Sequence, residues 1–528
     1  MRVGIISVFT DYHRQGRHHR GVLQPQIGPL IAALLPQDIE IDVVNDTWDD
    51  PDWERDYDLL FLSSLHSDFD RARQISHYWR RRGAKTVYGG PVASLYPQLC
   101  APFFDAIAIG DPEPVVAQIY RDFCSNELKP LYRALPYRGD LVPLPRLDLV
   151  ADRQISALAF EITRGCPFTC EFCILTGIGT RHHTRDVDTV VAQIDAARRI
   201  LKPLVPWHRR CMAIFYDNNI GGNPGYLRQF CNAIGKTGLP WGSCVTFNVV
   251  ADEANVARMA QAGCRLVYVG LETFNPAALA DMRKHQNLLG ETRRVVDLCR
   301  RHGILFTAGL MLSPTHDTLE YIDRIPEHLK ACGVHVPTYI CFETPFPGTP
   351  HFQRIASSPD PLLMPNALLS DLDAYTIVTR PRHAAAEDFA AAFKRTHRAV
   401  YGIGNRLTKL ADDLPRFARA GSLASMVLDV AETLYDVQPL PADRTYIAGR
   451  DKARPETVPL TDADFANEAE RSAVMRPWAV ADAAGRVLPH WLDSRRVYLP
   501  KGRIAPSRVS SEPLVTTVGD DIALMPVA

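Results

Sequence analysis

The chain has 528 residues, of which 46% are hydrophobic and 23% charged, and its formal net charge is −1. This length predicts about three domains with ample core, and the near-zero charge argues against a nucleic acid or an anionic membrane surface as partner. No signal peptide precedes the first strand-like run, and no apolar stretch reaches the ~18 residues of a membrane span. Nine of the twelve cysteines are scattered singly, as free thiols of a reducing cytoplasm are. We therefore expect a cytoplasmic globular protein.

The first 125 residues read as alternating strands and helices. Apolar, β-branched runs predict five strands, at residues 2–8, 40–44, 58–63, 85–88 and 105–109. Helical patterns, for example at 26–35 and 70–82, fill the gaps between them. This alternation predicts a doubly wound parallel sheet, which binds ligands at the carboxyl ends of its strands.

Three short motifs fall at those strand ends. The first strand is followed by Asp11-Tyr-His-Arg-Gln-Gly16, the third by Ser63-Ser-Leu65 and the fourth by Gly89-Gly90. In this order they resemble the D-x-H-x-x-G, S-x-L and G-G motifs of cobalamin-binding domains.

The resemblance implies a role for each motif. His13 would be the lower axial ligand of cobalt, with Asp11 orienting it. Ser63 would contact the buried nucleotide tail, and the two glycines would leave room for that tail. The sequence departs from the motif in a basic insert at residues 17–21. A loop histidine with no ligand role is therefore the alternative for His13, and His66 is a second candidate for the same face.

A second alternating unit follows a proline-rich linker at residues 126–155. Strands are predicted at 156–163, 212–216, 244–247, 265–271, 304–311 and 336–341, with amphipathic helices such as 187–200 and 318–332 between them. Parallel β/α units place their chemistry on the loops at the carboxyl ends of the strands.

The loop after the first of these strands contains Cys166, Cys170 and Cys173 in the spacing C-x3-C-x2-C. Three thiolates on one loop can hold three corners of a cubane 4Fe–4S cluster and leave the fourth iron open to a small molecule. Two other interpretations are three buried free cysteines, and a zinc site completed by His182 or His183.

This loop resembles the signature of the radical S-adenosylmethionine (SAM) superfamily. The resemblance implies that the open iron binds SAM, that an electron from the cluster cleaves SAM, and that Phe172 lies near the adenine. The six β/α units are similar to the partial barrel of these enzymes. With the preceding sheet, the chain resembles the cobalamin-dependent radical SAM family.

Polar residues at the neighbouring strand ends are the expected SAM contacts. Asp217 and Asn218 follow the second strand, where the family contacts the SAM amino group; turn formation is the alternative role for both. Thr246 and Asn248 follow the third strand, and Glu272 ends the fourth, where a carboxylate can accept two hydrogen bonds from SAM.

These observations predict an α/β protein of four parts. A cobalamin-binding-like sheet spans residues 1–125, a linker 126–155, a radical SAM core with a partial (β/α)6 barrel 156–355, and a mostly helical C-terminal extension 356–528. The expected cofactors are a 4Fe–4S cluster, SAM and cobalamin. The expected partners are a small-molecule substrate and an electron donor such as flavodoxin or ferredoxin.

The predicted reaction is cobalamin-dependent methyl transfer to an unactivated carbon. Alternatives within the same chemistry are a radical rearrangement or cyclisation, or transfer of the 3-amino-3-carboxypropyl group of SAM, without cobalamin. The alternative from another class is a non-catalytic iron–sulfur or zinc protein that acts as a redox sensor or scaffold. The substrate is not specified by the sequence.

Overall fold

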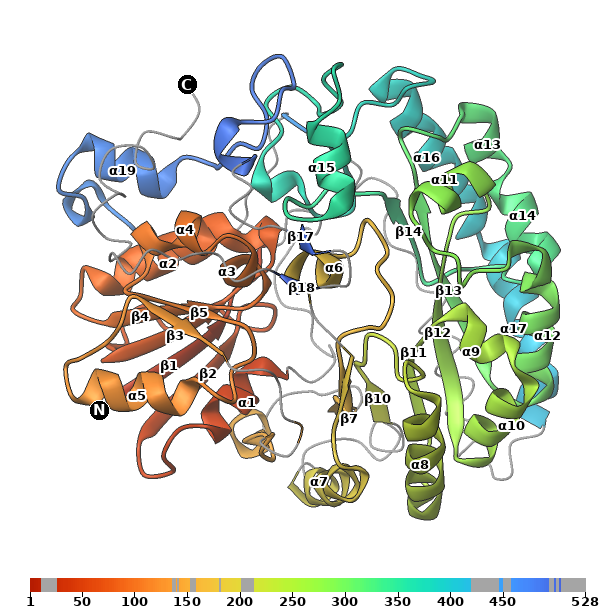
Figure 1. Ribbon diagram of the computed structural model, residues 1–528, viewed down its shortest axis with the longest axis horizontal. Coiled ribbons are helices and arrows are strands. Elements are labelled where there is room, and N and C mark those ends of the chain that lie inside the picture. The colour runs from red at the N-terminus through yellow and green to blue at the C-terminus, as the bar shows by residue number, and fades with distance from the viewer. Residues whose placement is uncertain are drawn as a thin grey trace.

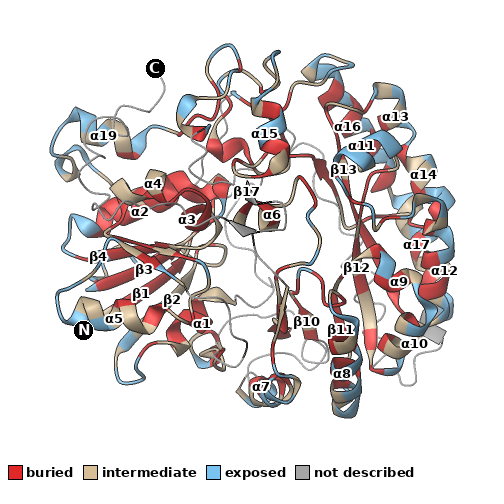
Figure 2. Cartoon of the chain, viewed as in Figure 1, coloured by how far each residue is buried: buried red, intermediate tan, exposed pale blue. Residues whose placement is uncertain are grey.

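The computed structural model describes residues 1–10, 26–134, 139, 142–151, 158–179, 182–200, 213–418, 446–449, 457–492, 498–499 and 503–504. Within these residues, two six-stranded parallel sheets lie side by side, and helices flank both of them (Figure 1). Buried residues gather on the inner strands of both sheets and on the helix faces that pack against them, and the outer faces of the helices are exposed (Figure 2).

The N-terminal sheet has the strand order β2-β1-β3-β4-β5-β6. Its strands are β1 (Arg2–Ser7), β2 (Glu40–Asn45), β3 (Leu59–Ser63), β4 (Lys85–Gly89), β5 (Ala106–Ile109) and β6 (Leu131–Arg133). Strand β2 lies on one side of β1, and β3 to β6 follow on the other side, so the strand order reverses between β1 and β3. Such a switch point opens a crevice at the carboxyl ends of the strands.

Helices cover both faces of this sheet. They are α1 (Ile27–Ala33) and α5 (Val116–Cys124) on one face, and α2 (Phe69–Arg80), α3 (Pro91–Leu95) and α4 (Pro97–Cys100) on the other. Continuous apolar runs such as Leu59-Leu-Phe-Leu form the strands because both of their faces are buried.

The second sheet is an open half-barrel with the strand order β14-β13-β12-β11-β10-β7. Its strands are β7 (Leu158–Phe160), β10 (Ala213–Phe215), β11 (Trp241–Val245), β12 (Cys264–Glu272), β13 (Leu305–Leu312) and β14 (Tyr339–Phe342). All pairs are parallel, so every strand presents its carboxyl end at the same edge.

Amphipathic helices pack on the outside of the half-barrel. They are α7 (Val187–Ile200), α8 (Pro224–Ile234), α9 (Phe247–Ala251), α10 (Glu253–Gln261), α11 (Pro276–Asp281), α12 (Thr292–Arg301), α13 (Leu319–Asp323) and α14 (Ile325–Cys332). The largest hydrophobic core joins them to the strands, with Phe215, Phe230 and Trp241 in edge-to-face contact. Two short strands, β8 (Thr163–Arg164) and β9 (His183–Thr184), pair antiparallel beside β7.

The C-terminal residues connect the two units. Helices α15 (Pro350–Ala356), α16 (Ala386–Val400), α17 (Ile403–Ala418) and α19 (Glu468–Met475) predominate, with two-residue strands at β15 (Thr376–Ile377), β16 (Tyr446–Ile447), β17 (Tyr498–Leu499) and β18 (Arg503–Ile504). Helix α19 docks on α2 through the fully buried Arg73, which bonds the carboxylate of Asp70 and the carbonyl oxygens of Ala473 and Arg476. Trp478 packs on the same arginine.

The predicted fold class is confirmed: two parallel α/β units are followed by a mostly helical region. Strand β6 lies within the segment that the sequence predicts to be a linker, because three residues are too few to show a periodic pattern. No helix in the described part of the chain is both long and apolar enough to cross a membrane.

Candidate functional site

The cysteine loop lies at the carboxyl end of β7 and leads into α6 (Ile174–Ile178), which Cys173 caps. The backbone N–H of Cys173 donates to the carbonyl oxygen of Cys170 (3.2 Å). The pKa of the Cys173 thiol is raised to about 11, chiefly by burial and to a smaller extent by the neighbouring Cys170 and Cys166 thiols. The three thiols therefore share one partly buried site.

The donor set fits an iron–sulfur cluster. The three thiols are soft ligands on one loop, and iron would displace protons that burial otherwise favours. Of the two histidines in the zinc alternative, His182 directs Nε2 to the carbonyl oxygen of Asn219 (3.3 Å), and His183 lies on β9, where its backbone pairs with that of Arg164. Among the described residues no three His, Cys, Asp or Glu side chains, the three cysteines included, are arranged around a single metal ion, so the cluster assignment rests on the donor type and on the shared loop.

Glu171 fastens the loop to two neighbouring segments. Its N–H donates to the carbonyl oxygen of Met282, and its own carbonyl accepts from the N–H of His351, both at 3.1 Å. Its carboxylate pairs with Arg283 and Arg354, each at 2.8 Å. Backbone and side chain thus hold the middle of the loop in place.

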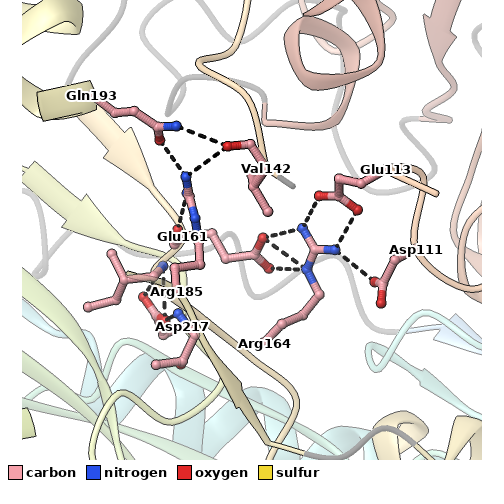
Figure 3. Close-up of polar contacts among 10 residues, drawn as sticks. Asp111, Glu113, Val142, Glu161, Arg164, Arg185, Gln193 and Asp217 are labelled. Atoms are coloured by element: carbon pink, nitrogen blue, oxygen red, sulfur yellow. Dashed lines mark hydrogen bonds and ion pairs between the residues drawn. The ribbon is translucent and has the colours of Figure 1, made fainter. Parts of the chain in front are cut away.

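Asp217 holds the approach to the loop (Figure 3). Its carboxylate, 1% exposed, accepts from the backbone N–H groups of Ile162 and Thr163. Burial raises its pKa to about 7. These contacts give Asp217 a structural role, and the contact with SAM expected of it remains a prediction. Its neighbour Asn218 is exposed.

The third strand ends earlier than predicted, so the residues after it have different surroundings. Thr246 caps α9 and donates to Oδ1 of Asn219 (3.4 Å), and Asn248 is exposed on that helix. The fully buried Asn219 also lies beside Cys166, where it lowers the pKa of that thiol against the larger, opposite effect of burial. Asn219 is thus closer to the cluster site than Asn218.

Glu272 ends β12 with φ of +65° and is paired with Lys284. Lys284 lies 5.9 Å from the ring centroid of Phe172. Its charge also lowers the pKa of the Cys170 thiol, opposing the larger effect of burial. A Cβ on Gly270 would meet Oε1 of Glu272 and Nζ of Lys284, so this ion pair would have to shift to admit a larger residue there. Glu272 and Phe172, both predicted as SAM contacts, therefore meet through a lysine that the sequence pattern did not reveal.

The segment that carries Lys284 forms one wall of this corner. Gln286 directs Nε2 toward the Cys170 thiol (3.6 Å). Asn287 donates from Nδ2 to the carbonyl oxygens of Gly270 and Leu271, both at 2.9 Å. No motif marks these residues, because the folded chain alone brings them to the cysteine loop.

The second candidate binding edge lies at the carboxyl ends of β3 and β4. Ser63 pairs in register with Gly89, and a Cβ on Gly90 would lie 2.6 Å from Oγ of Ser63. Leu65 is 58% exposed at this edge. The contact with a corrinoid tail that the resemblance implies for these residues remains a prediction.

Asp11, His13 and Gly16 lie outside the described residues. His66 is buried with Nε2 at 2.9 Å from the hydroxyl of Tyr96, and burial lowers its pKa to about 3. His66 is therefore engaged within the fold.

Residues 160–327 match the radical SAM superfamily. The chain carries a radical SAM domain. The matched region begins at β7 and includes the cysteine loop, Asp217 and Glu272. The three signature cysteines of this radical SAM domain lie at the carboxyl edge of the half-barrel, the same edge at which Glu272 ends β12.

Two curated proteins similar to this radical SAM protein are methyl-transferring enzymes by name. Bacteriochlorophyllide d C-8(2)-methyltransferase from Chlorobaculum tepidum is 25% identical over 345 residues, covering 62% of this chain and 75% of the relative. Hopanoid C-2 methylase from Rhodopseudomonas palustris is 23% identical over 350 residues, covering 63% and 64%.

Two solved structures share the fold over both parallel sheets. The radical SAM methyltransferase TsrM from Kitasatospora setae, with cobalamin and a 4Fe–4S cluster bound, matches with a TM-score of 0.57 at 16% identity, covering 83% of this chain and 98% of TsrM. The cobalamin-dependent SAM radical enzyme OxsB, with aqua-cobalamin and SAM bound, matches with a TM-score of 0.58 at 12% identity, covering 82% and 71%.

Proposed function

We propose that this radical SAM protein is a cobalamin-dependent methyltransferase that acts on an unactivated carbon of a small molecule. The observation that carries the proposal is the presence, in one chain, of a three-thiol loop and a second parallel sheet with Ser63 and Gly89 paired at its carboxyl edge. The methyltransferase names of the relatives, and the cobalamin and cluster bound in TsrM, support it. A bound 4Fe–4S cluster would supply an electron that cleaves SAM, and methylcobalamin would supply the methyl group.

The residues of the half-barrel have distinct roles in this proposal. The three cysteines hold the cluster, and Asn219 and Gln286 direct amide groups toward the thiols. Phe172, Glu272 and Lys284 form the corner that receives SAM, where aromatic and charged groups can meet its adenine, ribose and amino-acid ends. Thr246 borders the same edge.

The N-terminal sheet receives the corrinoid in this proposal. Ser63, Gly89 and Gly90 accommodate the nucleotide tail, and His13 is the candidate lower ligand. The protein also needs a one-electron donor of the flavodoxin or ferredoxin class, and a reducing compartment such as the cytoplasm suits an oxygen-sensitive cluster.

The test is corrinoid retention. Protein prepared anaerobically from cells supplied with hydroxocobalamin should retain a corrinoid with its visible absorption bands and a brown cluster absorbance. Cys173→Ala is the control, because it should lose iron and keep the corrinoid. Wild-type protein that retains no corrinoid would overturn the methyltransferase proposal in favour of radical chemistry without cobalamin.

The lower ligand has its own test. The electron paramagnetic resonance spectrum of bound cob(II)alamin shows nitrogen coupling when a histidine ligates cobalt. We expect this coupling in the wild-type protein and its loss in His13→Ala. Coupling that persists in His13→Ala, or that is missing from the wild type, would remove His13 from the site.

A further inference from the structure

We propose that Arg164 is a positioning residue that holds the carboxyl end of the N-terminal sheet at a fixed distance from the cysteine loop. This inference rests on the proposed function, in which a corrinoid on one sheet must act beside a cluster on the other. Two observations carry it: the contacts of the guanidinium, and the rigidity of the backbone from which it projects.

The guanidinium of Arg164 joins three carboxylates from two parts of the chain (Figure 3). It forms a two-bond fork with Glu113, both bonds at 3.0 Å, and bonds Asp111 at 2.8 Å. Both acids lie between β5 and α5, at the carboxyl end of the N-terminal sheet. The third partner, Glu161, lies beside β7 and accepts at 2.6 Å. One side chain thus connects the carboxyl edges of both sheets.

The backbone that carries Arg164 is held on both sides. Arg164 pairs with His183 between β8 and β9, and Asp217 accepts from the N–H of Thr163. Arg185 donates to the carbonyl oxygen of Glu161 (2.8 Å) and to Oε1 of Gln193 (2.6 Å). Arg164 stands two residues before Cys166. Because its backbone is held in place, its guanidinium has a fixed position relative to the cysteine loop.

The charges around Arg164 predict which way the β5–α5 loop would move if the guanidinium were removed. The side chains of Arg164 and Glu113 are 13% and 2% exposed, so little solvent screens them. Three carboxylates face one guanidinium, and without it Glu113 would be a buried anion close to Glu161. Repulsion and solvation would then favour moving the β5–α5 loop away from the cysteine loop.

A second set of contacts joins the two units near α3. Arg164 therefore has to fix their separation only near β5. A Cβ on Gly177 of α6 would lie 2.9 Å from the carbonyl oxygen of Gly348 and 3.4 Å from Leu95 of α3. The hydroxyl of Tyr96 bonds the carbonyl oxygen of Pro347. These close contacts fix the units near α3, and Arg164 fixes them near β5.

The first measurement needs no cofactor. Hydrogen–deuterium exchange should be faster in Arg164→Gln, by about tenfold for loss of a charge-assisted contact, at the protected amides within residues 110–115, which are Gly110, bonded to Ser94, and Val115, bonded to Pro112. Glu113→Gln should give the same change from the other side of the contact, and the double variant should add little. Arg164→Lys, which keeps the charge but not the fork, should fall between.

The second measurement reports distance. With reduced cluster and cob(II)alamin both bound, dipolar broadening of their paramagnetic resonance signals should be clear in the wild type and weaker in Arg164→Gln and Glu113→Gln. Arg395→Gln is the control, because it removes an arginine–carboxylate fork to Asp323 on the exterior of the half-barrel.

The outcomes separate the two proposals. Unchanged exchange at residues 110–115 in both variants, or unchanged broadening with both cofactors bound, would overturn the role of Arg164. A wild-type protein without corrinoid would overturn the proposed function, and the exchange measurement would still decide whether Arg164 holds the loop. A change in Arg164→Gln that Glu113→Gln does not reproduce would place the effect in the cysteine loop itself and contradict the inference.

Discussion

The ammonium group of Lys284 is paired with the carboxylate of Glu272 beside the cysteine loop, and both side chains are less than a tenth exposed. Removing one member of a buried pair leaves an uncompensated charge, which typically costs about 3–5 kcal/mol. We therefore expect Lys284→Met to lower the free energy of unfolding of the cofactor-free protein by that order. The double variant Lys284→Met, Glu272→Gln should recover most of the loss in urea unfolding. Equal stability of single and double variants would contradict the pairing.

Asp217 should act on the cysteine loop through its acceptor oxygen. Its Oδ1 accepts from the N–H groups of Ile162 and Thr163, so Asp217→Asn can keep both bonds. Asp217→Ala leaves two buried donors unsatisfied, each worth about 1–3 kcal/mol. We expect lower stability and lower iron content after reconstitution in the alanine variant alone. SAM titration of Asp217→Asn also tests the ligand role, because weakened binding would show that the carboxylate contacts SAM.

Gly90 and Gly89 provide a test variant and its control at the edge of the N-terminal sheet that we propose binds the corrinoid. Gly90 has φ of +94° and ψ of −165°, a conformation nearly exclusive to glycine, and an added Cβ would meet Ser63. The Cβ of Gly89→Ala would meet nothing closer than 3.8 Å. Gly90→Ala should lower stability by about 1–3 kcal/mol and reduce corrinoid retention, and Gly89→Ala should change stability little. Similar stability of the two variants would contradict the local geometry.

Asp68 should make the stability of the protein depend on pH. Burial raises its pKa to about 8, although the N–H of Thr10 donates to it at 2.9 Å. Between the unfolded pKa of about 3.9 and this value, the folded state retains a proton that the unfolded state has lost, so rising pH destabilises the fold by about 1.4 kcal/mol per pH unit. Asp68→Asn removes this contribution. Its free energy of unfolding relative to wild type should rise between pH 5 and 7, and a pH-independent difference would mean that Asp68 is ionised when folded.

Much of the architecture follows from local patterns. The β/α alternation predicted both sheets, and the three-cysteine spacing predicted the radical SAM domain, which the family match over residues 160–327 confirms. The third barrel strand was predicted at residues 244–247 and lies at Trp241–Val245. Gly242 and Ser243 have weak strand propensity, whereas Phe247 favours strands but begins a helix that Thr246 caps.

The side-chain partners were not predictable in the same way. Lys284 reaches Glu272 across a helix and a turn, and Arg164 reaches Glu113 across 51 residues. Neither spacing is periodic, so only the folded chain brings these charges together. For Asp217 the strand-end position was predicted, but the direction of its carboxylate toward the backbone depends on how β7 continues into β8.

Mass spectrometry of the products formed from SAM tests the central claim most directly. Anaerobically reconstituted protein with hydroxocobalamin, SAM and a strong reductant should release 5′-deoxyadenosine, from reductive cleavage, and S-adenosylhomocysteine, from methylation of the corrinoid. Cys170→Ala should release no 5′-deoxyadenosine, because its cluster would lose a ligand. Methylthioadenosine in place of both products would indicate aminocarboxypropyl transfer, and no SAM-derived product from the cluster-loaded wild type would contradict the account.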